Sequence, residues 1–283
     1  MKLTHGVKRK LLQIAAFGFS NVHMTNFVGG KIYEGKWKQF CNPGLNCYSC
    51  PAASLACPIG ALQAVSGSMD FKFSFYVVGF LLAVGVLLGR AVCGWLCPFG
   101  LIQEVIHKIP SPKFRLWRWV KYIKYVILAV FVILLPITVT NFMGMGKPAF
   151  CQYICPAGTL EGGIPLLTMH DELRQTIGPL FFVKAVILIG TIVGCVLIYR
   201  FFCKALCPLG AIYGLLNKIS MYHLEVDHHK CVGCGKCVSV CKMDVDPVKT
   251  PNSAECIRCG NCKAVCPVKA IHMGFGSRKE KNG

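Results

Sequence analysis

Two runs of four cysteines near the C-terminal end are the strongest chemical signal in the sequence. Each run has the spacing Cys-x2-Cys-x2-Cys-x3-Cys, which is typical of proteins with two iron–sulfur clusters, where the fourth cysteine of each run binds the cluster of the other. Zinc is disfavoured, because zinc sites use one or two Cys-x2-Cys pairs. The pattern predicts one [4Fe–4S] cluster on Cys231, Cys234, Cys237 and Cys266 and a second on Cys256, Cys259, Cys262 and Cys241.

A shorter cysteine motif occurs twice. Residues 90–100 read RAVCGWLCPFG and residues 200–210 read RFFCKALCPLG, so Arg, two Cys, Pro and Gly recur at an offset of 110. The proline suits the first turn of a helix, and a helix N-terminus favours the negative charge of a cluster. Each motif supplies half of a ligand set, and four buried free thiols would not explain the repeated spacing. The repeat therefore predicts one shared [4Fe–4S] cluster on Cys93, Cys97, Cys203 and Cys207.

Six further cysteines have partners that the sequence leaves open: Cys41, Cys47, Cys50, Cys57, Cys151 and Cys155. Cys57 and Cys155 both precede Pro, so repeat symmetry groups Cys57 with Cys151 and Cys155, and Cys50 is the preferred fourth ligand. The alternative takes Cys41, Cys47, Cys50 and Cys57 from one loop. Either choice leaves two thiols, for a disulfide or for a second metal site with a non-cysteine ligand.

The composition places these motifs in a membrane protein. Hydrophobic residues make up 54% of the 283 residues and charged residues 15%, whereas soluble domains carry about 25% charged residues. These values exclude an ordinary soluble globule and a disordered chain. A spanning helix needs about 20 mainly apolar residues, and four segments are predicted to span: 11–29, Phe73–Gly89, Tyr125–Thr140 and Leu180–Tyr199.

The distribution of basic residues predicts the orientation of these helices. Of the 31 Lys and Arg residues, 24 lie in segments 1–10, 90–124 and 200–283. The positive-inside rule then places both termini in the cytoplasm, in the plasma membrane of a prokaryote. Anionic lipid beside these segments accounts for the net charge of +19, and no nucleic-acid partner is expected.

The predicted fold class is mainly α-helical, with two parallel membrane repeats and a C-terminal α+β ferredoxin domain that holds two [4Fe–4S] clusters. The repeats occupy residues 1–110 and 111–222, and each contains two helices, an outer cysteine loop and an inner Cys-x3-Cys-Pro motif. The ferredoxin domain covers residues 223–275 and a basic tail covers 276–283. Two helices per repeat give both copies the same orientation, so a pseudo-two-fold axis along the membrane normal relates them.

The doubled Cys-x3-Cys-Pro motif followed by the two-cluster tail resembles the membrane polyferredoxin family, which includes the NapH-type quinol dehydrogenase subunits and the C-terminal part of NosR-type regulators. The resemblance covers almost the whole chain. It rests on Cys93 and Cys97, on Cys203 and Cys207, and on the eight tail cysteines. It implies electron transfer between the membrane or cytoplasm and extracytoplasmic redox partners, and the analogy suggests a flavoprotein as acceptor.

The resulting functional prediction is a transmembrane electron conduit with about four [4Fe–4S] clusters: two in the tail, one at the inner face and at least one at the outer face. The expected donor is a cytosolic ferredoxin or another reduced donor, and the expected acceptor is an extracytoplasmic redox protein. A quinone or flavin would bridge clusters that lie too far apart. The alternatives are a quinol dehydrogenase or quinone reductase subunit of a respiratory system, with His23 and Asn26 as polar contacts in the first span, and a redox sensor or assembly factor.

Overall fold

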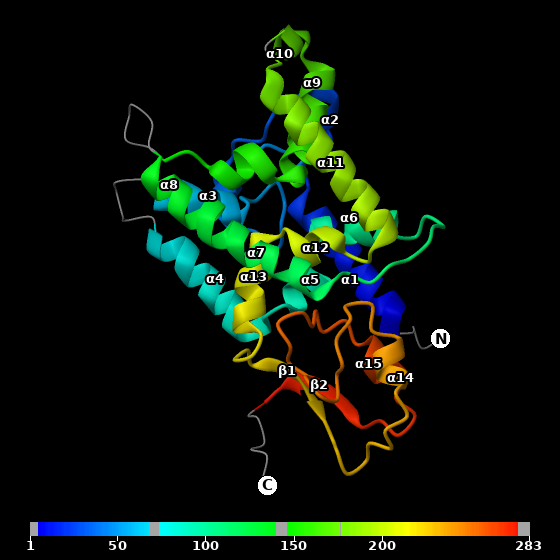
Figure 1. The fold of residues 1–283 in the computed structure, drawn as a ribbon. Helices are drawn as coiled ribbons and strands as arrows, with labels where there is room; N and C mark the ends of the chain where they lie inside the picture. The colour runs from blue at the N-terminus through cyan, green and yellow to red at the C-terminus, as the bar shows by residue number, and fades with distance from the viewer. Residues whose placement is uncertain (1–4, 68–73, 140–145, 176, 277–283) are drawn as a thin grey trace.

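The computed structural model describes residues 5–67, 74–139, 146–175 and 177–276 (Figure 1). It is mainly helical, with a small sheet at one end, as the sequence predicts. Phe73 and Thr140, which bound two predicted spans, and residues 277–283 of the predicted basic tail lie outside the described residues.

The first half of the chain contains two longer helices, α1 and the apolar α4, and several short ones. Its elements are α1 (His5–Ser20), α2 (Asn26–Gly29), the 3-10 helix η1 (Lys36–Gln39), α3 (Pro58–Ser66), α4 (Ser74–Leu88), α5 (Ala91–Trp95) and α6 (Pro98–Ile106). Cys57 and Cys97 are the N-caps of α3 and α6, and each helix begins at the proline that follows its cysteine. The locked φ of proline suits this first position, and its missing N–H costs nothing there.

The second half of the chain also contains a helix that begins at the proline after a capping cysteine. Its elements are η3 (Arg118–Tyr122), α7 (Ile123–Ile127), the π-helix η4 (Leu128–Leu134), α8 (Leu135–Thr138), the π-helices η5 (Phe150–Ile154) and η6 (Gly158–Gly163), α9 (Ile164–Met169), α10 (Asp171–Gln175), α11 (Pro179–Leu197), α12 (Phe201–Ala205) and α13 (Pro208–Leu216). Cys207 caps α13, and its Sγ accepts a hydrogen bond from the backbone N–H of Gly210.

Two helices of the described chain are long and apolar enough to cross a membrane. They are the continuous helix Arg118–Thr138, with a mean hydropathy of 2.2, and Pro179–Leu197, with 2.6. Only 22% and 17% of their most apolar windows are buried inside the molecule. Their apolar side chains therefore face outward, which suits contact with lipid rather than a soluble core. These helices overlap the predicted spans Tyr125–Thr140 and Leu180–Tyr199, and each begins earlier in the chain than predicted.

The other two predicted spans are short or divided. Helix α4 occupies residues 74–88 of the predicted span Phe73–Gly89, but its 15 described residues extend about 22 Å, less than the roughly 30 Å hydrocarbon core. The predicted span 11–29 is divided, because α1 ends at Ser20 and α2 starts at Asn26. Polar contacts cause the break: the Asn21 side chain donates back to the Phe17 carbonyl, and the His23 backbone N–H donates to Ala52.

The ferredoxin domain is closed by a pair of antiparallel strands, β1 (Tyr222–Val226) and β2 (Ile271–Phe275), with Val226 opposite Ile271. Two short helices, α14 (Lys236–Ser239) and α15 (Asn261–Val265), follow the Cys-x2-Cys turns. Gly235 and Gly260 cap them with φ of 70° and 79°, a conformation that glycine adopts without steric cost. Both cysteine runs thus form the same turn, and the sheet joins the start of the domain to its end (Figure 1).

One hydrophobic core connects the membrane halves to the ferredoxin domain. Phe99 of α6 and Phe202 of α12 pack edge to face with ring centroids 5.1 Å apart. The same buried cluster includes Met243, Val245 and Ile257 of the ferredoxin domain. The three parts of the chain are therefore packed against one another around the cysteine motifs.

Candidate iron–sulfur sites

The four inner cysteines come together where the two halves of the chain meet. Cys93 lies in α5 and Cys97 caps α6, while Cys203 lies in α12 and Cys207 caps α13. All four are 4–5% exposed. Burial, together with the negative charge of a neighbouring Cys203 thiolate, raises the pKa of the Cys97 and Cys207 thiols. Four mutually close buried thiols are the donor set of a [4Fe–4S] cluster, which neutralises this repulsion with iron.

Two buried arginine side chains each reach from one half of the chain to the other. The Arg90 guanidinium donates to the Cys203 carbonyl at 2.9 Å, and the Arg200 guanidinium donates to the Cys93 carbonyl. Both side chains are fully buried. A Cβ atom at Gly210 would lie 3.3 Å from the Arg90 guanidinium, and one at Gly100 would lie 3.3 Å from that of Arg200. The reciprocal contacts show that the repeated sequence folds into equivalent halves that face each other.

Hydrogen bonds to sulfur complete the inner site. The Gln103 amide donates to the Cys203 Sγ at 3.0 Å, and the Leu45 backbone N–H donates to the Cys97 Sγ at 3.4 Å. Gln103 was not singled out by the sequence reasoning. The sequence feature that identifies Gln103 is a longer motif, Cys-Pro-x-Gly-x-x-Gln, which starts at Cys97 and recurs at Cys57.

The recurrence of this motif identifies an equivalent arrangement at the outer cysteines. Gln63 stands six residues after Cys57, and its amide donates to the Cys151 Sγ at 3.1 Å. Its oxygen accepts from the Phe150 backbone N–H at 2.8 Å, as the Gln103 oxygen accepts from the Cys203 N–H at 3.4 Å. In both cases the glutamine of one half contacts the first cysteine of the other half. The outer site is therefore built like the inner one.

The structure brings Cys47, Cys57, Cys151 and Cys155 together at the outer site. A Cβ atom at Gly60 would lie 3.9 Å from the Cys151 Sγ, and one at Gly158 would lie 3.9 Å from the Cys47 Sγ. Burial and the negative charge of Cys151 raise the pKa of Cys57 to about 12. Burial also raises the pKa of Cys155, with added repulsion from the other three thiols.

Cys50 is the fourth ligand that the sequence favours. It packs with Ala52 and Ala53 in a small core against which Cys47 also packs, and its thiol lies 4.0 Å from the Asn21 side-chain oxygen. Cys47 and Cys50 are the ends of a tight turn, with the Cys50 N–H donating to the Cys47 carbonyl. Of these two cysteines, Cys47 is the one that lies near Cys57, Cys151 and Cys155.

The two remaining unassigned thiols lie apart from the outer set. Cys41 is buried in the main core, where its backbone bridges to Ala56. Cys195 lies in α11, and its thiol is 3.7 Å from the Gln103 oxygen. All nineteen cysteines are unpaired, so no disulfide joins Cys41 and Cys50.

A single loop connects the inner site to the outer site. Gly44 lies against the inner motif, since a Cβ there would be 2.7 Å from the Cys97 Cα. The Leu45 N–H binds the Cys97 Sγ, and the next N–H, that of Asn46, is a hydrogen-bond partner of Cys57. Two consecutive backbone N–H groups therefore contact one sulfur of the inner site and one sulfur of the outer site. Two hydrogen-bond lengths and the step between neighbouring backbone nitrogens place these two sulfurs roughly 11 Å apart at most.

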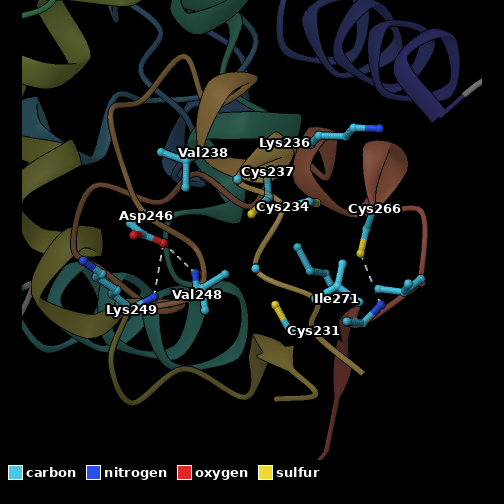
Figure 2. A pocket seen from close by; sticks show the side chains of 15 residues that line it. Cys231, Cys234, Lys236, Cys237, Val238, Asp246, Val248, Lys249, Cys266 and Ile271 are labelled. Carbon is cyan, nitrogen blue, oxygen red and sulfur yellow. Dashed lines mark hydrogen bonds between the residues drawn. The ribbon is translucent and has the colours of Figure 1, made fainter. Parts of the chain in front are cut away.

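The first tail set surrounds a surface cavity of about 210 Å³ (Figure 2). Its lining includes Cys231, Cys234, Cys237 and Cys266. The Ala270 backbone N–H donates to the Cys266 Sγ at 3.3 Å. Cys234 is exposed and the other three are half-buried, so this set lies at the surface of the ferredoxin domain.

The second tail set lies against the membrane part. Burial and the negative charge of nearby thiols raise the pKa of Cys256 to about 11 and that of Cys262 to about 12, and Cys241 and Cys259 are the neighbours. Ile257 contacts Gly94, which lies between Cys93 of α5 and Cys97 at the start of α6. The second set is therefore the one that faces the inner site.

The junction around the second set is held by buried polar contacts. The Trp95 indole donates to the Arg258 carbonyl at 3.0 Å, and the Asn217 amide donates to the Cys256 carbonyl at 3.1 Å. Glu255 pairs with Arg90 at 2.7 Å and also with Lys124. Although burial opposes its ionisation, the charges of Arg90 and Lys124 lower the pKa of Glu255 to about 2. The carboxylate is therefore ionised and ties the second cysteine run to both halves.

None of the described His, Cys, Asp and Glu side chains form a group of three or more tight enough for a single metal ion. A four-iron cluster binds each thiolate to a different iron, so its ligands stand further apart than those of one ion. The four sets of four thiols, with N–H donors at the sulfurs, fit clusters of this kind.

The residues considered for quinone contact have other partners. The His23 ring stacks on Tyr33 with centroids 3.9 Å apart. The Asn26 amide donates to the Pro51 carbonyl at 3.3 Å. Both side chains thus serve local packing near α2.

Comparison with known protein families matches these cysteine sets. A family model described as a 4Fe-4S binding domain matches residues 73–116, 126–164 and 180–223, and each segment contains one Cys-x3-Cys-Pro motif. Two further models of the same description match residues 223–245 and 250–272, which contain the two tail runs.

Curated relatives include proteins with electron-transport and ferredoxin-type names. The chain is 25% identical to the putative electron transport protein YccM of Escherichia coli, over 62% of this chain and 52% of YccM. It is 28% identical to the methylamine utilization ferredoxin-type protein MauN of Methylorubrum extorquens, over 66% and 60%, and 28% identical to the regulatory protein NosR of Stutzerimonas stutzeri, over 62% and 24%. The chain therefore spans less than two thirds of the length of these relatives. No solved structure matches it.

Proposed function

The chain belongs to the membrane-bound [4Fe–4S] polyferredoxin family of iron–sulfur electron-transport proteins, and from this membership we propose that it carries electrons through the membrane. The proposed donor is a reduced cytosolic protein such as a ferredoxin, and the proposed acceptor is an extracytoplasmic redox protein, for which a flavoprotein is the family analogy. When bound, [4Fe–4S] clusters supply reversible one-electron transfer without a proton or a covalent intermediate.

Four ligand sets are proposed, in a fixed spatial order. The surface set is Cys231, Cys234, Cys237 and Cys266, and the junction set is Cys241, Cys256, Cys259 and Cys262. The inner set is Cys93, Cys97, Cys203 and Cys207, and the outer set is Cys47, Cys57, Cys151 and Cys155. Exposure falls along this order from the surface set to the inner set.

One observation carries the proposal: the loop of Gly44, Leu45 and Asn46 lies between the inner and outer sulfurs. Leu45 and Asn46 donate consecutive amides to Cys97 and Cys57. Tyr213 packs in the same region, fully buried, and its hydroxyl donates to the Pro43 carbonyl at 2.9 Å. Leu45, Asn46 and Tyr213 are all buried, so protein side chains occupy this region.

The membrane topology is part of this proposal. Helix α11 runs from the end of the molecule that carries α10 toward the end that carries the ferredoxin domain (Figure 1). The start of α1 also lies against that domain, because His5 contacts Gly260. With the basic segments on the same side, we place the chain as a multi-pass protein of a prokaryotic plasma membrane with both termini in the cytoplasm.

Rapid reduction in the absence of quinone tests the proposal. Photoreduced ferredoxin is mixed with the full-length protein in quinone-free detergent, and electron paramagnetic resonance follows the clusters in samples frozen at successive times. We expect signals from all four clusters without added quinone, and loss of the outer signal alone in Cys57→Ser. A requirement for added quinone before the outer cluster is reduced would overturn the conduit.

A further inference from the structure

Two adjoining cavities lie between the membrane part and the ferredoxin domain. The larger has a volume of about 400 Å³ and the smaller about 170 Å³, and both are lined by His107, Tyr199 and Lys242. Cys241 of the junction set lines the larger cavity, and it is the one cysteine among the lining residues of the two. Their contents are therefore not explained by the proposed clusters.

Basic side chains dominate the walls. Seven line the two cavities: Arg9, Lys10, Lys108, Lys113, Arg115, Lys204 and Lys242. Only two carboxylates, Glu104 and Asp244, face them. An excess of five positive charges around one concave space attracts an anion.

Both carboxylates are already neutralised by the protein. Glu104 accepts hydrogen bonds from Arg9 at 2.9 and 3.0 Å and from Arg200. Asp244 accepts from Lys204 at 2.7 Å and lies 3.5 Å from Arg115. These partners balance the negative charge of both carboxylates, so the other basic side chains of the cavities are left in excess.

Lys10 also pairs with Glu104, whereas Lys108, Lys113 and Lys242 have no acidic partner among the described residues. The Lys113 ammonium donates to three carbonyls and to the Ser111 hydroxyl. The Lys242 ammonium lies over the Tyr199 ring, 5.4 Å from its centroid, and is exposed, as is Lys108. The donors of Lys113 are thus occupied by the protein, and the Lys108 and Lys242 ammonium groups are the ones available to an anion from outside the chain.

The cavities lie near the C-terminal end of α11 and near the loop that leads to the N-terminal end of the helix Arg118–Thr138. The His107 ring contacts the Cys195 carbonyl and the Ser111 hydroxyl donates to the Val196 carbonyl, both in the last turn of α11. The same loop leads to Trp117 and Trp119, each 75% exposed, at the start of the helix Arg118–Thr138. Exposed tryptophans of this kind mark the interface between hydrocarbon and water.

We propose that the two cavities form one binding site for the phosphate group of an anionic phospholipid headgroup. The basic walls, the position at the cytoplasmic interface and the anionic character of that leaflet point to the same ligand. Lys242 belongs to the ferredoxin domain and Lys108 to the membrane part, so a phosphate between them would join the two. The inference rests on the membrane orientation in the proposed function, but not on electron transfer.

Lipid binding by the purified holoprotein tests this site. The full-length protein is exchanged into neutral detergent and titrated with phosphatidylglycerol or phosphatidylcholine, and native mass spectrometry counts the lipids retained per chain. We expect one tightly retained phosphatidylglycerol and no equivalent phosphatidylcholine. Lys108→Gln and Lys242→Gln should each weaken retention about fivefold, and the pair about thirtyfold.

A matched variant and a soluble probe complete the test. Lys218→Gln makes the same charge change at an exposed lysine outside both cavities and should leave retention unchanged. Inorganic phosphate that displaces the lipid at equal concentration would assign the site to a soluble phosphate instead of a headgroup. Equal retention of both lipids, or equal loss in Lys218→Gln and Lys242→Gln, would refute the site.

The outcome separates this inference from the proposed function. Iron and acid-labile sulfide are measured in every variant, because Lys242 follows the junction ligand Cys241. If phosphatidylglycerol is retained selectively while ferredoxin fails to reduce the clusters, the lipid site stands and the conduit fails. If ferredoxin reduces the clusters but phosphatidylglycerol is not retained selectively, the conduit stands and the lipid site fails.

Discussion

Glutamine side chains give each membrane site one defined hydrogen bond to sulfur. Gln103 donates to Cys203 in the inner site, and Gln63 donates to Cys151 in the outer site. Both are fully buried or nearly so, at 1% and 0% exposure. Because a hydrogen bond to sulfur stabilises the more negative, reduced state of a cluster, each glutamine is expected to raise the potential of its own site.

Replacing one glutamine should change one potential. We predict that Gln103→Leu lowers the midpoint potential of the inner cluster and leaves the outer one unchanged, and that Gln63→Leu does the opposite. Redox titration followed by electron paramagnetic resonance measures both potentials in each variant. Equal shifts of both clusters in either variant would contradict separate sites.

Substituting Cys47 and Cys50 separately identifies the fourth ligand of the outer cluster. We predict that Cys47→Ser loses one cluster of four irons, because Cys47 lies with Cys57 and Cys151. Cys50→Ser should keep the full iron content, because Cys50 packs beside Asn21. Iron and acid-labile sulfide per chain are the measurements, and loss of iron in Cys50→Ser but not in Cys47→Ser would reverse the assignment.

At the scale of elements, the junction between α5 and the second tail run determines how closely two cluster sites approach. Gly94 contacts the Ile257 carbonyl, and a Cβ at Gly94 would have no room. Trp95 and Asn217 hold the same run by hydrogen bonds to its carbonyls. A glycine is therefore required where the ferredoxin domain packs on α5.

We predict that Gly94→Ala retains all its iron but slows electron transfer from the tail clusters to the inner cluster, because the added methyl group displaces Ile257. Gly79→Ala is the matched control, since a Cβ in the middle of α4 meets nothing within 4 Å. Stopped-flow absorbance after mixing with reduced ferredoxin gives the rates. Identical rates in the two variants would show that this contact does not set the distance.

A second junction joins α1, α6 and α12 through Glu104. Although burial opposes its ionisation, the charges of Arg200 and Arg9 hold the pKa of Glu104 well below its usual value. A depressed pKa stabilises the fold above the unfolded pKa of about 4.5, and this contribution is lost as the pH falls below it. At neutral pH the contribution is complete.

We therefore predict that Glu104→Gln destabilises the protein by about 3–5 kcal/mol at pH 7, because it leaves buried guanidinium groups unpaired. Lys10→Gln should cost much less, since its side chain is 31% exposed. Thermal unfolding followed by circular dichroism compares the two variants. A larger loss in Lys10→Gln would be inconsistent with the buried arginines as the main partners.

At the scale of the whole molecule, the four cysteine sets form a continuous path from the surface of the ferredoxin domain into the membrane part. The surface set is exposed, the junction set contacts α5, and the inner and outer sets share one loop. One core with Phe99, Phe202 and Ile257 holds these parts together. The arrangement favours electron transfer along the chain over isolated clusters.

The sequence was sufficient for features that depend on short spacing. The Cys-x2-Cys runs, the inner Cys-x3-Cys-Pro pair and the helix starts after Cys97 and Cys207 follow from local geometry. The break after Ser20, the approach of Cys47 to Cys57 and Cys151, and the contact of Leu45 with Cys97 depend on tertiary packing. No local pattern encodes contacts between segments that lie far apart in the sequence, so these features could not be predicted.

Vectorial electron transfer in quinone-free vesicles tests the central claim most directly. The full-length protein is reconstituted with ferricyanide trapped inside, and photoreduced ferredoxin is added outside. The account predicts that the internal ferricyanide is reduced at a rate that depends on the protein and is abolished in Cys57→Ser. Reduction that proceeds unchanged in Cys57→Ser, or that begins only when quinone is added, would contradict it.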